Sequence, residues 1–106
     1  MMELYDIFIA FVSWGSEGKR RPILILDVID ENVKAFSITT QYESKSEEIR
    51  VRYFVITDWK QSGLDRPSYV NTNNTVTIPL TAVDSNNPIG KLTASDERRL
   101  VEFIAI

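Results

Sequence analysis

Apolar and polar residues alternate over the first part of the chain with the two-residue period of β-strands. In residues 5–12, both of the alternating faces are largely apolar, which predicts a buried first strand. The apolar run at residues 23–26 predicts a second strand, and Pro22, which has no N–H to donate, is expected at its entrance. Residues 33–39 predict a third strand, because large apolar side chains alternate there with small or polar ones.

The segments that join these strands carry turn and loop residues. Residues 13–19 hold two glycines and two serines and are expected to form a loop. The turn at residues 30–32 closes a hairpin between the second and third strands. Residues 41–48 have almost no apolar content and are expected to form a mobile surface loop.

Alternation resumes after this loop. Residues 49–56 predict a fourth strand, with Arg50 and Arg52 on one of its sides. Residues 57–63 begin with a capping residue and end in glycine, which predicts a single helical turn.

The last third of the chain predicts short strands at residues 68–71 and 75–80, followed by one helix over residues 93–106. Thr93 is expected to cap this helix, with Asp96 three residues further on. Many short strands and one terminal helix indicate a mainly β fold. The expected architecture is a small SH3-like antiparallel β-barrel with a C-terminal helix, since closure removes exposed strand edges.

The composition limits the possible chemistry. A length of 106 residues allows one compact domain, expected to span residues 1–106. The chain has neither histidine nor cysteine, which excludes Ser-His-Asp triads, histidine-dependent ribonuclease mechanisms, thiolate catalysis, disulfides and the usual zinc sites. No apolar stretch is long enough for a membrane span and no signal peptide is evident, so a cytoplasmic protein is expected.

The charge pattern points to local cationic contacts. A net charge of -3 argues against a broad electrostatic grip on nucleic acid. The densest basic cluster is Lys19-Arg20-Arg21, whose first two members are interpreted as general phosphate contacts or solvated charges. Trp14 and Trp59 could stack on bases, but packing in the core or at a dimer interface is the preferred interpretation.

Four segments carry motifs that are informative because of their order. They are Asp6-Ile7-Phe8 with the glycine-containing segment 15–26 that includes Arg21-Pro22, Ser37-Ile38-Thr39-Thr40-Gln41, the segment 63–70 from Gly63-Leu64 to Ser68-Tyr69-Val70, and Ile89-Gly90-Lys91-Leu92-Thr93. In this order they resemble the motifs of the MazF/PemK family of toxins, over nearly the whole chain. Tyr5 stands where many members of that family have glycine before Asp6.

The resemblance implies a CcdB/PemK-type fold and the activity of an mRNA interferase. Such an enzyme is a sequence-specific endoribonuclease that cleaves single-stranded RNA without a metal. The RNA 2′-hydroxyl attacks the adjacent phosphate and leaves a 2′,3′-cyclic phosphate and a 5′-hydroxyl. The resemblance also implies the toxin of a toxin-antitoxin system, a homodimer whose partners are mRNA and a cognate antitoxin. No cofactor, metal or membrane partner is expected.

The resemblance also assigns roles to residues. Arg21 and Thr39 match the catalytic arginine and threonine of the family. Arginine suits a phosphate because its planar fork donates paired hydrogen bonds, and Pro22 restricts the backbone of Arg21. The residues expected to bind substrate are Glu17, Lys19, Arg20, Thr40, Gln41, Arg50 and Arg52.

Two other functions stay open at this point. The same barrel is found in CcdB-type toxins, which poison DNA gyrase and cleave nothing. A non-catalytic SH3-like interaction module is the second alternative, and it would be favoured if Arg21 and Thr39 pointed to separate surfaces.

Overall fold

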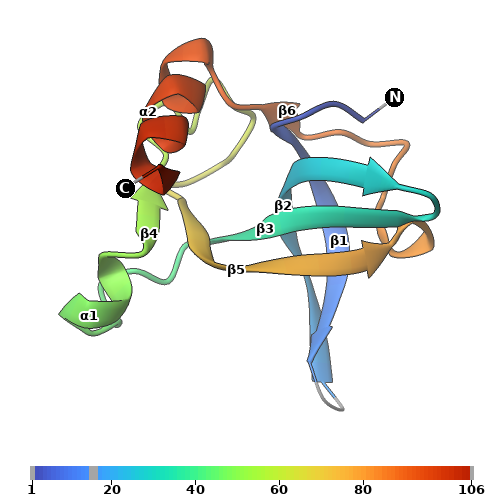
Figure 1. Cartoon of the computed structure of the whole chain (residues 1–106), viewed down its shortest axis with the longest axis horizontal. Coiled ribbons are helices and arrows are strands. Elements are labelled where there is room, and N and C mark those ends of the chain that lie inside the picture. Colours follow the sequence, from blue (N-terminus) through green and yellow to red (C-terminus); the bar gives the residue numbers. More distant parts are fainter. Residues whose placement is uncertain (1, 15–16, 106) are drawn as a thin grey trace.

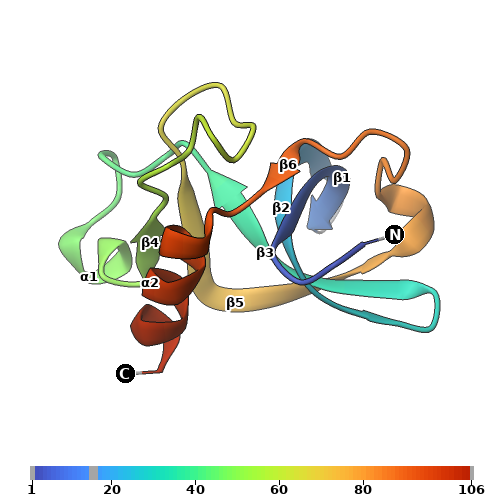
Figure 2. The same cartoon turned by 90° about the horizontal axis from the view of Figure 1, so that it is seen from above.

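The computed structural model describes residues 2–14 and 17–105. Its elements are β1 (Asp6–Trp14), β2 (Glu17–Ile29), β3 (Asn32–Thr39), α1 (Glu47–Arg50), β4 (Tyr53–Val55), β5 (Tyr69–Pro79), the 3-10 turn η1 (Leu80–Ala82), β6 (Gly90–Lys91) and α2 (Ala94–Ile104). The strands form one antiparallel sheet in the order β4-β5-β3-β2-β1-β6 (Figure 1). Figure 2 shows this sheet curled into a half-barrel, with α2 beside β4 and β5. The prediction of a mainly β fold with a curled sheet and a C-terminal helix is confirmed.

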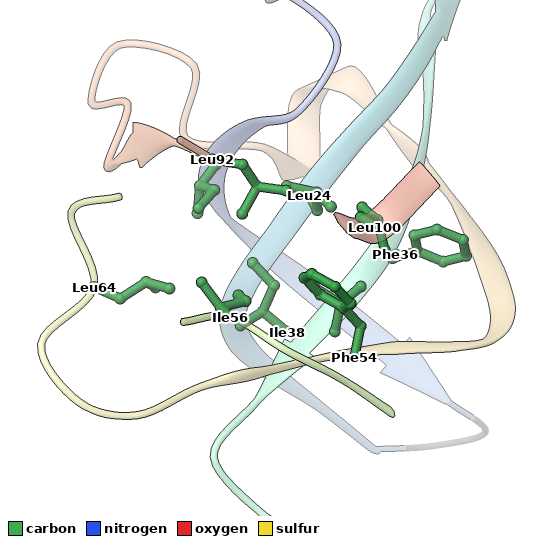
Figure 3. Packing of buried hydrophobic residues seen from close by; sticks show 10 residues of the cluster. Leu24, Phe36, Ile38, Phe54, Ile56, Leu64, Leu92 and Leu100 are labelled. Atoms are coloured by element: carbon green, nitrogen blue, oxygen red, sulfur yellow. The ribbon is translucent and has the colours of Figure 1, made fainter. Parts of the chain in front are cut away.

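The core lies on both faces of the central strands, because successive residues of a strand point to opposite faces. One cluster joins the sheet to α2 and includes Leu24, Ile38 and Leu100, as Figure 3 shows. The other cluster, on the opposite face, includes Phe8 and Ile23. This double burial explains why the first predicted strand is apolar on both sides.

The β1–β2 hairpin is longer than the sequence suggested (Figure 1). β1 continues to Trp14 and β2 begins at Glu17, so most of the predicted loop over residues 13–19 is paired strand. Pro22 was expected at the entrance of the second strand, and this was wrong, because it lies inside β2 opposite Ile9. Pairing of β2 with β3 starts only at the next residue, Ile23, so Pro22 marks the end of that ladder.

The segment predicted as a strand over residues 49–56 divides into α1, a turn and the short strand β4. The alternation had predicted a strand with one buried apolar face, but Ile49 and Val51 are exposed. Two acidic residues in the first turn favour the N-terminal end of a helix. Arg50 therefore ends α1, Arg52 lies in the turn that follows, and the two do not share one side of a strand.

β5 is one continuous strand where two short strands were predicted. Its pairing with β3 shifts between Ala35 opposite Val76 and Ser37 opposite Asn71, so residues 72–75 bulge outward. Thr72 anchors this bulge, since its backbone N–H and its hydroxyl both donate to the carbonyl oxygen of Arg52, at 3.0 and 2.6 Å. The polar bulge explains the apparent gap between the two predicted strands.

α2 is capped as predicted. The Thr93 hydroxyl accepts the backbone N–H of Asp96 at 3.2 Å. The Asp96 carboxylate is fully buried and accepts the backbone N–H groups of Thr57 and Asp58 at 3.3 and 2.8 Å, and the Arg99 guanidinium at 2.6 Å. This network ties α2 to the segment after β4. Within the described residues, no helix is both long and apolar enough to cross a membrane.

The segment from Asp58 to Gly63 forms hydrogen-bonded turns that include the predicted single helical turn. The Ser62 N–H donates to the Asp58 carbonyl at 3.0 Å, and Gly63 ends the turns with a φ of 94°. A side chain at Gly63 would also meet the carbonyl oxygen of Ile89 at 2.2 Å. Glycine is therefore required here by both backbone conformation and space.

Candidate functional site

A pocket of about 310 Å³ opens where β2 and β3 stop pairing. It is lined by a segment of β2, the end of β3 with the two residues that follow it, and one residue that precedes β5. These residues are Lys19, Arg20, Arg21, Pro22, Ile38, Thr39, Thr40, Gln41 and Ser68. Pro22 separates the strands because it ends the ladder at Ile23 and Ser37. Two motifs that are distant in the sequence therefore meet at one opening.

The register places Arg21 and Thr39 on the same face of the sheet. Ile23 and Ser37 are directly paired, so their side chains share a face. Arg21 lies two residues before Ile23, and Thr39 lies two residues after Ser37. Because side chains alternate along a strand, both belong to that face. Arg20 belongs to the opposite face, so the adjacent arginines Arg20 and Arg21 leave β2 in different directions.

The Thr39 hydroxyl is oriented by the chain that follows it. Its oxygen accepts the backbone N–H of Gln41 at 3.0 Å. A hydroxyl has one proton to donate as well as lone pairs, so the proton of Thr39 stays available for a bound group. The next residue, Tyr42, stacks on the Tyr69 ring with centroids 4.2 Å apart and planes inclined by 8°. Tyr69 pairs with Thr39 across the β3–β5 ladder, so the stack holds residues 40–42 beside the pocket.

The pocket is positively charged. Lys19, Arg20 and Arg21 line it, and no acidic side chain does so among the described residues. Arg20 is partly neutralised, because its guanidinium lies 3.6 Å from the Asp84 carboxylate. The lining therefore suits an anionic group that can use planar, paired hydrogen bonds from arginine. In the described ranges 2–14 and 17–105, no group of three or more acidic side chains gathers that could hold a metal ion.

Three residues predicted to bind substrate lie outside this pocket. Glu17 is exposed at the start of β2, opposite Trp14. Arg50 lies 5.6 Å from the centroid of the Tyr42 ring and forms a 3.9 Å ion pair with Glu43. Arg52 lies beside the bulge of β5. Of the predicted substrate-binding residues, the structure brings only Lys19, Arg20, Thr40 and Gln41 together with Arg21 and Thr39.

Ser68 lines the pocket although it was not among the predicted site residues. It is buried, and its hydroxyl donates to the Arg66 carbonyl oxygen at 2.8 Å. Its position in the Ser68-Tyr69-Val70 motif was the available signal. Trp59 packs against the α2-side core, in agreement with the preferred interpretation. The Trp14 side chain, like Gly15 and Ser16, lies outside the described residues.

Two solved structures have a similar fold. The structure described as Mycobacterium tuberculosis toxin MazF-mt6 matches with a TM-score of 0.72 and 31% sequence identity, over 94% of this chain and 92% of that chain. A second, described as an Mtb toxin, matches with a TM-score of 0.66 and 30% identity, over 94% of this chain and 96% of that chain. Neither a protein-family model nor the sequence of a curated protein matches the chain.

Proposed function

Because the chain belongs to the MazF toxin family, we propose that it is the cytoplasmic toxin of a toxin-antitoxin pair and that it cleaves single-stranded RNA at specific sequences without a metal ion. The observation that carries this proposal is the placement of Arg21 and Thr39 on one face, at a cationic pocket. A scissile phosphate in that pocket would face both residues.

The proposed reaction uses a nucleophile from the RNA. The 2′-oxygen forms a bond to the adjacent phosphorus while the bond from phosphorus to the 5′-oxygen breaks. The products are a 2′,3′-cyclic phosphate and a 5′-hydroxyl. One proton leaves the 2′-oxygen and one reaches the 5′-oxygen. We assign these transfers to water, because no carboxylate lines the pocket among the described residues.

The protein residues align the RNA and stabilise charge. The planar Arg21 guanidinium donates paired hydrogen bonds to the phosphoryl oxygens, where negative charge increases in the transition state. The Thr39 hydroxyl, held by Gln41, orients the phosphate or the 2′-hydroxyl. Lys19 and Arg20 attract the flanking phosphates, with Arg20 shared between RNA and Asp84.

The alternatives are less well supported by this geometry. A non-catalytic interaction module would be favoured by Arg21 and Thr39 on separate surfaces, but the register gives them one face. A gyrase poison needs a protein-binding surface rather than a small cationic pocket between two strands. The pocket therefore favours nucleic acid cleavage over both.

We include two partners in the proposal. The first is a second copy of this chain, because Val51, Val55 and Ile104 are exposed apolar side chains on the surface formed by α2, β4 and the turn after α1. The second is a cognate antitoxin with a flexible acidic segment that occupies the cationic pocket. Its binding should weaken with salt. If the complex cleaved RNA as fast as the free toxin, occlusion of the pocket would be the wrong mechanism.

The proposed function is tested by the ends of the products. A long single-stranded RNA incubated with the protein should be cut at a limited set of sites, and each cut should leave a 2′,3′-cyclic phosphate and a 5′-hydroxyl. An oligonucleotide with one 2′-deoxy residue at the scissile position should remain intact. Normal cleavage of the deoxy substrate would contradict the 2′-hydroxyl mechanism, and no cleavage of any RNA would contradict the proposed function.

A further inference from the structure

An aromatic side chain is exposed on β1, on the face of the β1–β2 hairpin that also carries Arg20. Phe11 keeps 48% of its surface in solvent, although large apolar residues in strands usually pack against neighbours. We propose that Phe11 is a stacking subsite for one nucleobase of the RNA, on the face of the β1–β2 hairpin opposite to Arg21 and Thr39. This inference rests on the proposed function and adds a position at which the RNA is held by its base.

The Phe11 ring is supported from one side by a glycine. Gly18 lies on the neighbouring strand, where an added Cβ would come within 2.4 Å of Phe11 Cζ and 2.7 Å of Phe11 Cε1. The ring therefore lies against the Gly18 backbone, in space that any other residue would fill. A ring fixed in this way loses little conformational entropy when a ligand covers its exposed side.

Phe11 is continuous with the pocket through Arg20. The two residues are directly paired between β1 and β2, so their side chains share a face of the sheet. Arg20 in turn lines the pocket. The edge of β2 that faces β3 is unpaired before Ile23. A nucleotide chain that leaves the Arg21 and Thr39 face around this edge would pass Arg20 on its way to Phe11, with a phosphate near the guanidinium and a base near the ring.

The chemistry around Phe11 favours a nucleobase as the occupant. Aromatic rings that alternate with basic side chains are the common means of holding single-stranded nucleic acid, since every base offers a flat π surface. Here Arg20, which is directly paired with Phe11, supplies the basic side chain on the same face, and Lys19 lies next to it on the other face. A stacking contact accepts any base, so the subsite contributes affinity and register rather than strict sequence readout.

The test compares side chains at position 11 on a substrate of known cleavage site. An oligoribonucleotide is built around one site mapped on a long RNA, and single-turnover rates are measured against enzyme concentration. We expect Phe11→Ala and Phe11→Leu to raise the half-saturating concentration by roughly 5- to 150-fold with little change in the maximal rate. Phe11→Trp keeps an aromatic ring and should have a half-saturating concentration close to that of the wild type. The control is Ile29→Ala, which removes a similarly exposed apolar side chain from the C-terminal end of β2, far along the strand from Arg20. It should change neither the half-saturating concentration nor the maximal rate.

Abasic residues identify the base that stacks. Substrates with one abasic residue at each position around the cleavage site are cleaved by wild type and by Phe11→Ala. At one position the abasic substitution should weaken the wild type and leave Phe11→Ala unchanged, because both changes remove the same contact.

Three other results would contradict the inference, and each of them has a different meaning. If the wild type cleaves and Phe11→Ala and Phe11→Leu match it on every substrate, the subsite is wrong and the proposed function stands. If Phe11→Ala instead changes the mass of the particle in light scattering, Phe11 belongs to an interface between copies of this chain. If the wild type neither binds nor cleaves single-stranded RNA, the proposed function and the subsite both fail.

Discussion

Arg21 on β2 and Thr39 on β3 share one face of the sheet, although neither takes part in the β2–β3 ladder. The ladder ends at Ile23 and Ser37, and both residues lie two positions beyond it. The paired part of the strands therefore fixes the direction of the side chains, while the unpaired part leaves room between them for a ligand. A rigid scaffold that ends in an open site is a common way to position catalytic groups.

We expect Arg21→Ala to lower the single-turnover cleavage rate by about 10²- to 10³-fold, because it removes a preorganised donor aimed at developing charge. Arg20→Ala is the matched control. Arg20 lies on the other face and pairs with Asp84, so its loss should mainly raise the half-saturating RNA concentration and reduce the salt dependence by about one phosphate contact. Equal loss of maximal rate in both variants would mean general attraction rather than a positioned catalytic group.

Substitutions at Thr39 separate the hydroxyl from the shape of the side chain. We expect Thr39→Val to lower the maximal rate by about 10²-fold, since it keeps the shape and removes the hydroxyl. Thr39→Ser should keep most of the activity. The backbone N–H of Gln41, which donates to Thr39, is exposed, so water replaces that bond in the valine variant. Circular dichroism should show unchanged folding, and an active Thr39→Val would remove the hydroxyl from the mechanism.

The location of the pocket was predictable because its residues lie in short continuous motifs. Residues that are adjacent in the sequence stay close in space. The neighbours of Arg21 and of Thr39 therefore lie near them even where the bounds of the strands were predicted wrongly. Arg50 and Arg52 were misplaced for the opposite reason. Their position depended on an alternation that looked like a half-buried strand, whereas the apolar residues in it are exposed. A short alternating run does not by itself distinguish a strand from a helical turn, and its apolar residues need not be buried.

The residue before Asp6 has a backbone conformation that explains why many family members have glycine at this position. Tyr5 adopts a φ of 69°, in the left-handed region that glycine enters without steric cost. Glycine before this aspartate in many MazF/PemK proteins fits that backbone. In this chain the Tyr5 side chain packs against the core between the sheet and α2, which offsets part of the strain. Neither the strain nor the packing could be predicted from alternation.

We expect Asp96→Ala to lower the free energy of unfolding by about 1–3 kcal/mol, measured by urea denaturation. The carboxylate is fully buried and accepts two backbone N–H groups that would be left without an acceptor. The loss of the ion pair adds less, because the Arg99 side chain is 44% exposed and water can solvate it. Glu97→Ala, on the same turn of α2, is the control. An equal loss in both variants would indicate helix propensity rather than the buried network.

We expect the protein to be a homodimer that buries the exposed apolar surface of α2, β4 and the turn after α1. Val51→Glu and Ile104→Glu place charges on this surface and should yield monomers in light scattering at micromolar concentration, whereas Ile29→Glu, on an exposed site at the end of β2, should not. A charge buried without a partner in an interface strongly disfavours association. A monomeric wild type, or dimers in all three variants, would exclude this surface as the interface.

We expect EDTA to leave cleavage unchanged. The chain has no histidine or cysteine, so the usual ligands of transition metals are missing, and a magnesium site would need clustered carboxylates. Charge stabilisation must then come from protein cations, and Lys19, Arg20 and Arg21 all line the pocket with Thr39. The measurement is single-turnover cleavage with EDTA and with added Mg²⁺, at constant ionic strength because salt itself weakens RNA binding. If EDTA abolished cleavage and Mg²⁺ restored it, a metal would take part in the reaction. The role of Arg21 would then be limited to binding, and Arg21→Ala should change the half-saturating RNA concentration more than the maximal rate.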